Sequence, residues 1–248
     1  MKFTEILFKT KEKLLDMLYP NDIKCIFCGR DILNFDERPF CDDCEKLEIE
    51  NKGNRCKFCD MKIPEGNLVC DFCAKEHKAF EKAYCPLVYN QSVRSAILKL
   101  KSDNARYLAK PFAKLICERI GEDDLKLDYI IPVPIHAKTK RKRGYNQAEL
   151  LANEIGKILN VQVLNDILIK EVATTEQKKL TYIERLDNVK NSFSLKDKKI
   201  LKNKSVLIVD DVMTTGATLD AVSRLFKGTC RHIYVCAVAR DNLETLKK

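Results

Sequence analysis

Several features are missing or scarce in this chain of 248 residues, and each argues against a class of protein. No apolar run approaches the about 18 residues that cross a bilayer, so a membrane span is not expected. Charged residues interrupt the N-terminal segment and no small-residue cleavage site follows it, which argues against a signal peptide. Tryptophan is absent, and aromatic residues do not cluster among the basic ones, as stacking on single-stranded nucleic acid would favour. We therefore expect a cytoplasmic protein.

The charge and the length of the chain set its broad class. The formal net charge of +9 is compatible with phosphate-bearing partners but does not require them. The length allows one large domain or two small ones with a substantial core. Over residues 1–20, apolar side chains recur near one face of a helix, which predicts an amphipathic helix that packs on the protein.

Most of the cysteines are paired along the sequence. Eight of the twelve lie between positions 25 and 73 as four Cys-x₂-Cys pairs. Two residues between thiolates let both sulfurs face one tetrahedral ion, and two such pairs complete a zinc site. The segment has few aliphatic residues and would hardly fold without a metal. We predict two structural zinc ions, one held by Cys25, Cys28, Cys41 and Cys44 and the other by Cys56, Cys59, Cys70 and Cys73.

Other arrangements of these cysteines remain open. Disulfides are disfavoured in the cytosol, and paired Cys-x₂-Cys turns suit zinc better than an iron–sulfur cluster. The sequence also allows cross-braced pairing of alternate turns, or a single zinc with four free thiols. The remaining cysteines stand alone in apolar surroundings and are predicted to be buried structural thiols, namely Cys85, Cys117, Cys230 and Cys236.

In the stretch from Ser205 to Thr218 the chain changes from apolar to acidic to hydroxylated. Residues 206–209 form a short uncharged run that is typical of a buried parallel strand. Asp210 and Asp211 follow, and adjacent carboxylates are tolerated mainly where a cation or sugar hydroxyls share their charge. Gly216 permits a tight turn into a helix, whose first N–H groups can bind an anion. The stretch predicts a pocket for a phosphorylated sugar with Mg²⁺.

An ordinary strand, turn and helix is the alternative interpretation of the same stretch. In that case Asp211 and Thr214 would only cap the helix that is expected over residues 219–226. Capping needs one polar residue, however, and explains neither the second acid nor the three threonines.

A second polar stretch follows the apolar strand that is predicted at Tyr129–Pro134. Two prolines remove backbone donors there, so the chain must turn at the strand's carboxyl end, where ligands bind in open α/β sheets. A basic loop comes next, before a helix over about residues 148–159, and it suits a pyrophosphate or a nucleic-acid backbone. A merely solvated loop and a general base at His136 remain open. The basic residues are Lys138, Lys140, Arg141, Lys142 and Arg143.

Both stretches resemble motifs of known families. Residues 205–218 look like the 5-phosphoribosyl-1-pyrophosphate (PRPP) motif of type I phosphoribosyltransferases, apolar residues followed by Asp-Asp-Val-x-Thr-Thr-Gly-x-Thr. Residues 131–136, followed by Arg-x-Arg-Gly-Tyr-Asn-Gln, are similar to the ComF family of competence-associated, phosphoribosyltransferase-like proteins. The cysteine pairs also resemble that family, as does Thr174-x-x-Gln177-x-x-Leu180 with Arg185, Asn188 and Phe193. The resemblance covers nearly the whole chain.

The resemblance implies an α/β fold in which a type I phosphoribosyltransferase-like parallel sheet carries helices on both faces, after a small cysteine-rich zinc-binding module. We expect an N-terminal helix over 1–20, a double zinc-knuckle module over 21–82 and a phosphoribosyltransferase-like domain over 83–248. The segment 171–191 would correspond to a hood that closes over PRPP and excludes water; a static insertion stays open. Its candidate contacts are Thr174, Gln177 and Arg185.

The same resemblance implies roles for the site residues. Asp210 and Asp211 would bind the ribose hydroxyls and steer Mg²⁺. Val133 and its neighbours, with Arg141 or Arg143, would meet the pyrophosphate. The 5-phosphate would lie on the N–H and hydroxyl groups of Thr214, Thr215, Gly216, Ala217 and Thr218.

Two functions of different class follow from this interpretation. The protein would bind Mg²⁺ with PRPP, or with another phosphorylated ribose, and act in DNA uptake during natural competence, with or without transfer of phosphoribose to an acceptor. Alternatively, it would be a non-catalytic binder of single-stranded DNA that uses the pocket as a sensor or a groove. In either case other competence proteins are expected partners.

Overall fold

The computed structural model describes residues 24–32, 38–47, 49–102, 105–170 and 192–241. The chain divides into two compact units, Met1–Leu47 and Glu48–Lys248. The second cysteine group therefore belongs to the same unit as the sheet. The predicted helix over residues 1–20 lies outside the described part of the chain, and the three-part division into 1–20, 21–82 and 83–248 stays a prediction. Within the described residues, no helix is both long and apolar enough to cross a membrane.

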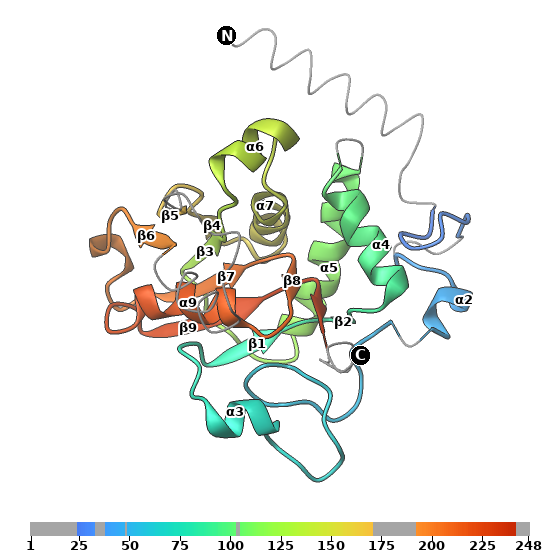
Figure 1. Cartoon of the computed structure of the whole chain (residues 1–248), viewed down its shortest axis with the longest axis horizontal. Helices are drawn as coiled ribbons and strands as arrows, with labels where there is room; N and C mark the ends of the chain where they lie inside the picture. Colours follow the sequence, from blue (N-terminus) through green and yellow to red (C-terminus); the bar gives the residue numbers. More distant parts are fainter. Residues whose placement is uncertain (1–23, 33–37, 48, 103–104, 171–191, 242–248) are drawn as a thin grey trace, which may run out of the picture. The chain divides into compact units, whose positions relative to one another are not determined.

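A five-stranded parallel sheet forms the centre of the larger unit (Figure 1). In the order of the sheet, its strands are β1 (Lys82–Tyr84), β9 (His232–Cys236), β7 (Ser205–Val209), β3 (Tyr129–Pro132) and β4 (Gln162–Val163). Every residue of β7 is buried, as expected for a central strand whose run of apolar side chains is covered on both faces. The strands predicted at residues 206–209 and from Tyr129 are confirmed.

Three of these strands are interrupted at the same level and then continue. A second parallel sheet contains β2 (Leu87–Val88), β10 (Ala239–Arg240) and β8 (Val212–Met213), which follow β1, β9 and β7 along the chain. At the interruption, Asp210 N donates to Cys236 O at 3.0 Å, and Val238 N donates to Asp211 O at 3.1 Å. The acid pair therefore follows the end of β7, as the sequence predicted, and lies in the irregular step between β7 and β8.

Helices cover both faces of the main sheet, and the alternation of its side chains shows which helix lies on which face. Ile131, Val206 and Ile208 belong to one buried cluster with Val222 and Phe226 of α9 (Ala217–Phe226). On the opposite face, α7 (Gln147–Leu159) approaches so closely that a Cβ on Gly156 would lie 2.6 Å from Val163 Cγ2 and 3.8 Å from Ile130 Cδ1.

The helices predicted over about residues 148–159 and over residues 219–226 are present as α7 and α9, and the predicted basic loop is wrong. Residues 93–100 belong to α4 (Gln91–Leu100), in which Val93, Ile97 and Leu100 are buried, and residues 111–120 belong to α5 (Ala109–Ile120). The basic residues form a short helix, α6 (Ala137–Arg143), and His136 Nδ1 accepts a hydrogen bond from Lys138 N at 3.1 Å at its start. The described residues also contain two short 3-10 helices, η2 (Arg106–Leu108) and η3 (Lys199–Leu201).

A small antiparallel pair flanks the predicted hood. In this pair β5 (Leu168–Lys170) runs beside β6 (Phe193–Leu195), with Lys170 opposite Phe193. The described residues on either side of positions 171–191 are therefore close together. The segment itself, with Thr174, Gln177 and Arg185, lies outside the described residues.

Each compact unit contains one cysteine module, and the two modules have the same local structure. In each, a Cys-x₂-Cys turn is closed by an antiparallel bridge, Lys24 with Asp31 in the first and Arg55 with Lys62 in the second. The second Cys-x₂-Cys pair of each module then opens a short helix, α2 (Asp42–Glu45) or α3 (Asp71–Lys75). The modules are thus two copies of one motif.

Candidate metal centres and phosphate site

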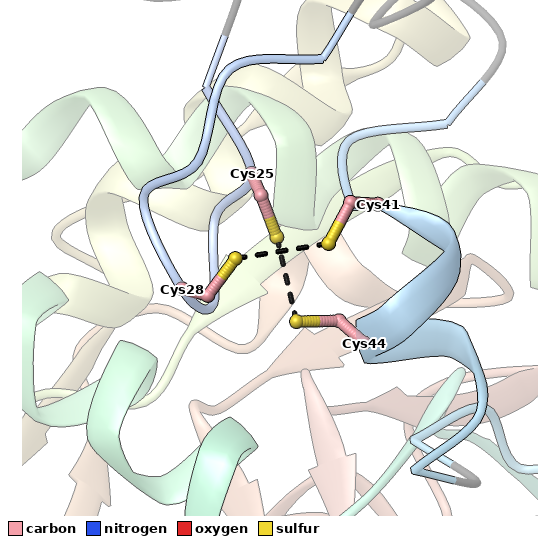
Figure 2. A group of neighbouring side chains, drawn as sticks. All are labelled: Cys25, Cys28, Cys41 and Cys44. Carbon is pink, nitrogen blue, oxygen red and sulfur yellow. Dashed lines mark hydrogen bonds between the residues drawn. The ribbon is translucent and has the colours of Figure 1, made fainter.

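The eight paired cysteines come together as two separate groups of four. In each group the four Sγ atoms lie within 4.8 Å of one another, and the groups are Cys25, Cys28, Cys41 and Cys44, and Cys56, Cys59, Cys70 and Cys73. In the first group, Cys25 Sγ lies 3.7 Å from Cys44 Sγ, and Cys28 Sγ lies 3.7 Å from Cys41 Sγ (Figure 2). The grouping follows the order of the sequence rather than a cross-braced pattern.

These distances fit a tetrahedral metal ion. Zinc–sulfur bonds of about 2.3 Å place the sulfurs of a tetrahedral site about 3.8 Å apart. All twelve cysteines are free thiols, and the paired ones could hold zinc if they ionise. The predicted burial of the isolated cysteines is confirmed for Cys85, Cys117 and Cys236, whereas Cys230 is only half-buried. Burial raises the pKa of all four, to about 12 for Cys117 and to about 11 for Cys230.

The second group is buried in the core of the larger unit. Its cysteines share one cluster of buried residues with the sheet and with α9, and Cys59 Sγ lies 3.6 Å from Cys70 Sγ. The residue after Cys59 has a left-handed backbone, with φ of 58° at Asp60 where the first module has Gly29 with φ of 76°.

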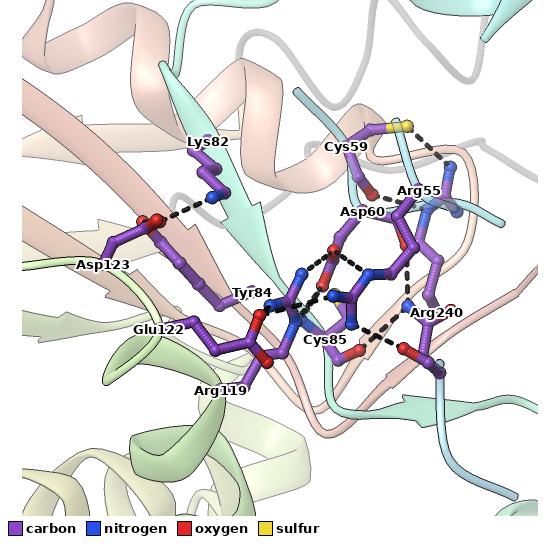
Figure 3. Close-up of polar contacts among 11 residues, drawn as sticks. Arg55, Cys59, Asp60, Lys82, Tyr84, Cys85, Arg119, Glu122, Asp123 and Arg240 are labelled. Carbon is purple, nitrogen blue, oxygen red and sulfur yellow. Dashed lines mark hydrogen bonds and ion pairs between the residues drawn. The ribbon is translucent and has the colours of Figure 1, made fainter. Parts of the chain in front are cut away.

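A buried ion pair holds this strained residue. Asp60 is 2% exposed, and Arg119 of α5 donates to its carboxylate at 2.6 and 3.2 Å (Figure 3). Asp60 Oδ2 also accepts from Cys85 N at 2.7 Å. Because removing one partner would leave a buried charge uncompensated, the pair fixes the second module against α5 and the chain after β1.

The acid pair lies beside the turn that follows β3. Pro132 is in register with Val209, and Val133 N donates to Val209 O at 2.9 Å. Asp210 and Asp211 therefore follow their strand next to Val133, as the parallel topology requires. Asp211 N donates to Asp210 Oδ1 at 2.8 Å. Desolvation and the adjacent Asp211 carboxylate raise the pKa of Asp210 to about 7.

Polar residues from two other segments hold Asp211, which is buried. Gln147 Nε2 donates to its Oδ2 at 2.6 Å, and Lys101 Nζ lies 3.0 Å from the same oxygen. Arg143 in turn donates to Gln147 Oε1. A continuous polar chain thus links the basic helix α6 to the acid pair, and it brings the predicted residues Arg143 and Asp211 into one site.

The start of α7 is fixed against the same edge of the sheet. Asn146 Nδ2 donates to Val133 O at 2.9 Å, while Asn146 Oδ1 accepts from Ala148 N at 3.1 Å and caps the helix. Tyr145 donates to Leu100 O at 2.7 Å, which joins this turn to the end of α4 next to Lys101. The buried Tyr-Asn-Gln sequence is therefore structural support for the site.

The hydroxylated stretch forms the turn between β8 and α9, and we call residues 214–218 the phosphate turn. Gly216 has φ of 78°, a conformation that favours glycine, and stands at the N-terminus of α9. Thr215 Oγ1 accepts from Ala217 N at 3.3 Å. The first N–H groups of a helix have no acceptor in the preceding turn, so this end of α9 can bind an anion.

Sequence reasoning gave most, but not all, of this arrangement. Arg141 lies exposed on α6, and no hydrogen bond of the described residues connects it to the acids. Lys101 was missed, because nothing around it in sequence marks it. Gln147 is the last residue of the Arg-x-Arg-Gly-Tyr-Asn-Gln motif, which marks this segment in the sequence, but no role in the site was predicted for it.

Three features together define a phosphoribosyltransferase-type fold. They are a parallel sheet with helices on both faces, an acid pair after its central strand, and a glycine turn before a helix. In agreement, residues 141–248 match the model of the phosphoribosyl transferase domain family. Competence protein F of Haemophilus influenzae is 30% identical over 212 residues, which cover 83% of this chain and 91% of that protein. The chain belongs to the ComF family.

Two further similarities are more distant. The DNA utilization protein YhgH of Escherichia coli is 25% identical over 190 residues, which cover 75% of this chain and 82% of that protein. Among solved structures, adenine phosphoribosyltransferase from Saccharomyces cerevisiae aligns with a TM-score of 0.36 and 19% identity, over 61% of this chain and 75% of that one.

Proposed function

We propose that this protein binds Mg²⁺ with PRPP, or a related phosphorylated ribose, and acts in the uptake or use of DNA in the cytoplasm. The observation that carries the proposal is the acid pair at the carboxyl end of β7, followed through β8 by the phosphate turn at the start of α9. The names of the relatives, a competence protein and a DNA utilization protein, support the cellular role. In this proposal, other competence proteins would be its partners. The free thiols suit a reducing compartment.

Each part of the site would meet one part of the ligand. Asp210 and Asp211 would accept hydrogen bonds from the ribose hydroxyls and orient Mg²⁺, whose preferred ligands are oxygens. The phosphate turn would hold the 5-phosphate. The turn at Val133, with Arg143 of α6, would meet the pyrophosphate, because the planar guanidinium matches its oxygens. The two structural zinc ions would be held by the two four-cysteine groups.

If transfer of phosphoribose occurs, these residues act by electrostatics. Displacement at C1 of the ribose develops positive charge on the sugar and negative charge on the leaving pyrophosphate. The fixed carboxylates and arginines would stabilise these charges, and bound Mg²⁺ would supply positive charge for the leaving pyrophosphate. No covalent nucleophile is required of the protein.

The second candidate function is the binding of single-stranded DNA without catalysis, and α6 is the observation that favours it. Five of its seven residues are basic, and all of these except Arg143 are exposed. Such a surface suits a phosphate backbone whatever its sequence.

Titration calorimetry of the full chain tests the proposal and separates the two functions. The chain is titrated with PRPP, with and without Mg²⁺, and separately with a single-stranded oligonucleotide. Saturable, Mg²⁺-dependent PRPP binding supports the first. Binding of the oligonucleotide alone would leave only the second. If both bind, a competition titration shows whether they share the pocket.

Replacing Arg141 and Arg143 together by alanine is expected to lower the affinity for both PRPP and single-stranded DNA. The DNA affinity should also fall with salt, with a slope in log–log form of about −0.7 for each phosphate contact, so the double variant should have a shallower slope. Lys157→Ala, which alters an exposed lysine at the far end of α7, is the matched control. DNA binding that ignores salt and both arginines would show that α6 is only solvated surface.

The affinity for Mg²⁺ and PRPP is expected to fall as the pH is lowered through about 7, where Asp210 takes up a proton. The stability of the ligand-free protein should change in the opposite sense. Because the pKa of Asp210 lies above the ordinary 3.8, its charged form is disfavoured on folding, and stability from this group is lost as the pH rises from that value to about 7. Binding and melting measured between pH 5 and pH 8.5 on wild type and Asp210→Asn check both trends. A wild-type affinity that does not change across this range would contradict the role of Asp210.

A further inference from the structure

Arg240 is a buried arginine that connects the second cysteine group to the phosphate turn. It lies in β10 and is 2% exposed. On one side, its Nε donates to Cys59 O at 3.0 Å, and its Nη2 lies 3.8 Å from Cys59 Sγ (Figure 3). On the other side, its Nη1 donates to Met213 O at 2.9 Å and to Thr214 O, the first carbonyl of the phosphate turn. One guanidinium thus bridges residues that are far apart in sequence.

The position of the turn depends on the residue that Arg240 holds. Met213 is buried, and its carbonyl also accepts from Asp241 N at 3.0 Å. Its side chain lies against the turn, since a Cβ on Gly216 would come within 2.7 Å of Met213 Cε. A shift of Met213 would therefore move Gly216 and the start of α9.

The surroundings of the Arg240 guanidinium depend on the state of the cysteines. Its carbonyl acceptors carry dipoles but no net charge, and a buried guanidinium needs a counter-charge. Four thiolates around one divalent metal carry a net charge of −2, next to Arg240 at Cys59. Without the metal, nothing holds the four cysteines in the tetrahedral arrangement that places Cys59 O and Cys59 Sγ against the guanidinium. Metal at the second group and the buried conformation of Arg240 should therefore stabilise each other.

We propose that Arg240 is a positioning residue that couples metal binding at Cys56, Cys59, Cys70 and Cys73 to the conformation of the phosphate turn, and through it to ligand affinity. Only the last step rests on the proposed function. The coupling is reciprocal, so a ligand that orders the turn slows the loss of this metal. The first cysteine group belongs to the other unit.

The test compares Arg240→Met, which removes the charge and keeps much of the volume, with Arg240→Lys and with the control Arg224→Met. Arg224 is an exposed arginine on α9 whose partner is Asp220. Release of zinc to a chelator is followed in a Cys28→Ser background, so that only the second group contributes. Hydrogen exchange reports on residues 213–218, and calorimetry with ribose 5-phosphate reports on binding.

In Arg240→Met we expect zinc release, and amide hydrogen exchange of residues 213–218, to be at least about tenfold faster than in wild type. Its affinity for ribose 5-phosphate should be at least about tenfold lower. Both changes lie within the usual range of coupling between sites. Arg240→Lys should fall between wild type and Arg240→Met, and Arg224→Met should match wild type. Ribose 5-phosphate should slow zinc release in the presence of Arg240 and not in Arg240→Met.

If Arg240→Met releases zinc, and exchanges the amide hydrogens of residues 213–218, at the same rates as wild type, the proposed coupling is wrong. If wild type binds no ribose 5-phosphate but zinc release and exchange still change, the proposed function fails and the coupling stands. Should Arg240→Met not fold, Arg240→Lys decides, because wild-type values for release and exchange in that variant contradict a role for the bidentate contacts of the guanidinium.

Discussion

Asp210→Asn with Asp211→Asn is expected to abolish the binding of Mg²⁺ with PRPP while the melting temperature of the ligand-free protein holds or rises. Asparagine keeps the size of the side chain and removes the negative charge, so the desolvation and the repulsion by Asp211 that raise the pKa of Asp210 no longer act against the folded state. Binding responds in the opposite direction, because Mg²⁺ and the ribose hydroxyls lose their ionised partners. Calorimetry and thermal melting of the same preparations measure both effects.

The opposite signs of these two effects separate a binding site from ordinary helix capping. If the acids were only structural, the double change would cost about 0.5–2 kcal/mol of stability and wild type would bind no PRPP. Asp128→Asn is a matched control, since Asp128 accepts hydrogen bonds from Ser205 N and Lys204 at the other end of the same strand. A destabilised double variant that binds PRPP as well as wild type would refute the site.

Removing one cysteine from each metal centre should have unequal consequences. Cys70→Ser is expected to release one zinc and to unfold much of the larger unit, because its group shares a buried cluster with the sheet and α9. Structural zinc in zinc-finger peptides contributes on the order of 10 kcal/mol, so the loss is large compared with the stability of a typical domain. Cys28→Ser should also release one zinc and unfold its own module, but leave the melting of the larger unit unchanged.

Metal analysis, limited proteolysis and melting of both variants check this asymmetry. Cys230→Ser is the control for the loss of a thiol, because Cys230 stands alone and is half-buried. Wild-type zinc content and protease resistance in Cys28→Ser would show that the first group holds no metal. A normal melting transition in Cys70→Ser would show that the second group does not support the core.

The sequence predicted the parts of the site that depend on local patterns. A run of apolar residues, two acids and a glycine turn follow one another along the chain, and the parallel topology then puts Val133 beside Asp210. The grouping of the cysteines was also predictable, since each four-cysteine group is built from consecutive Cys-x₂-Cys pairs.

Contacts between distant segments could not be predicted in this way. Gln147 reaches Asp211 across 64 residues, and Arg240 reaches Cys59 across 181. Neither pair has a sequence signal beyond the polar character of its members. For the same reason, the burial of the second cysteine group against the sheet was not visible in a segment that is poor in aliphatic residues.

The basic segment was predicted wrongly for a different reason. A cluster of lysines and arginines next to two prolines favours an exposed loop, and exposure is what the structure shows for most of them. Lysine and arginine are also good helix formers, however, and His136 caps the first turn while Gly144, with φ of 84°, ends the helix. The capping residues on both sides were the signal for α6.

The most direct test of the central claim is a crystal structure of the full chain with Mg²⁺ and PRPP. The account predicts the ribose hydroxyls and the metal on Asp210 and Asp211, the 5-phosphate on the N–H groups of residues 214–218, and the pyrophosphate near Val133 and Arg143. PRPP bound at another place, with Asp211 still held by Gln147 and Lys101, would contradict it.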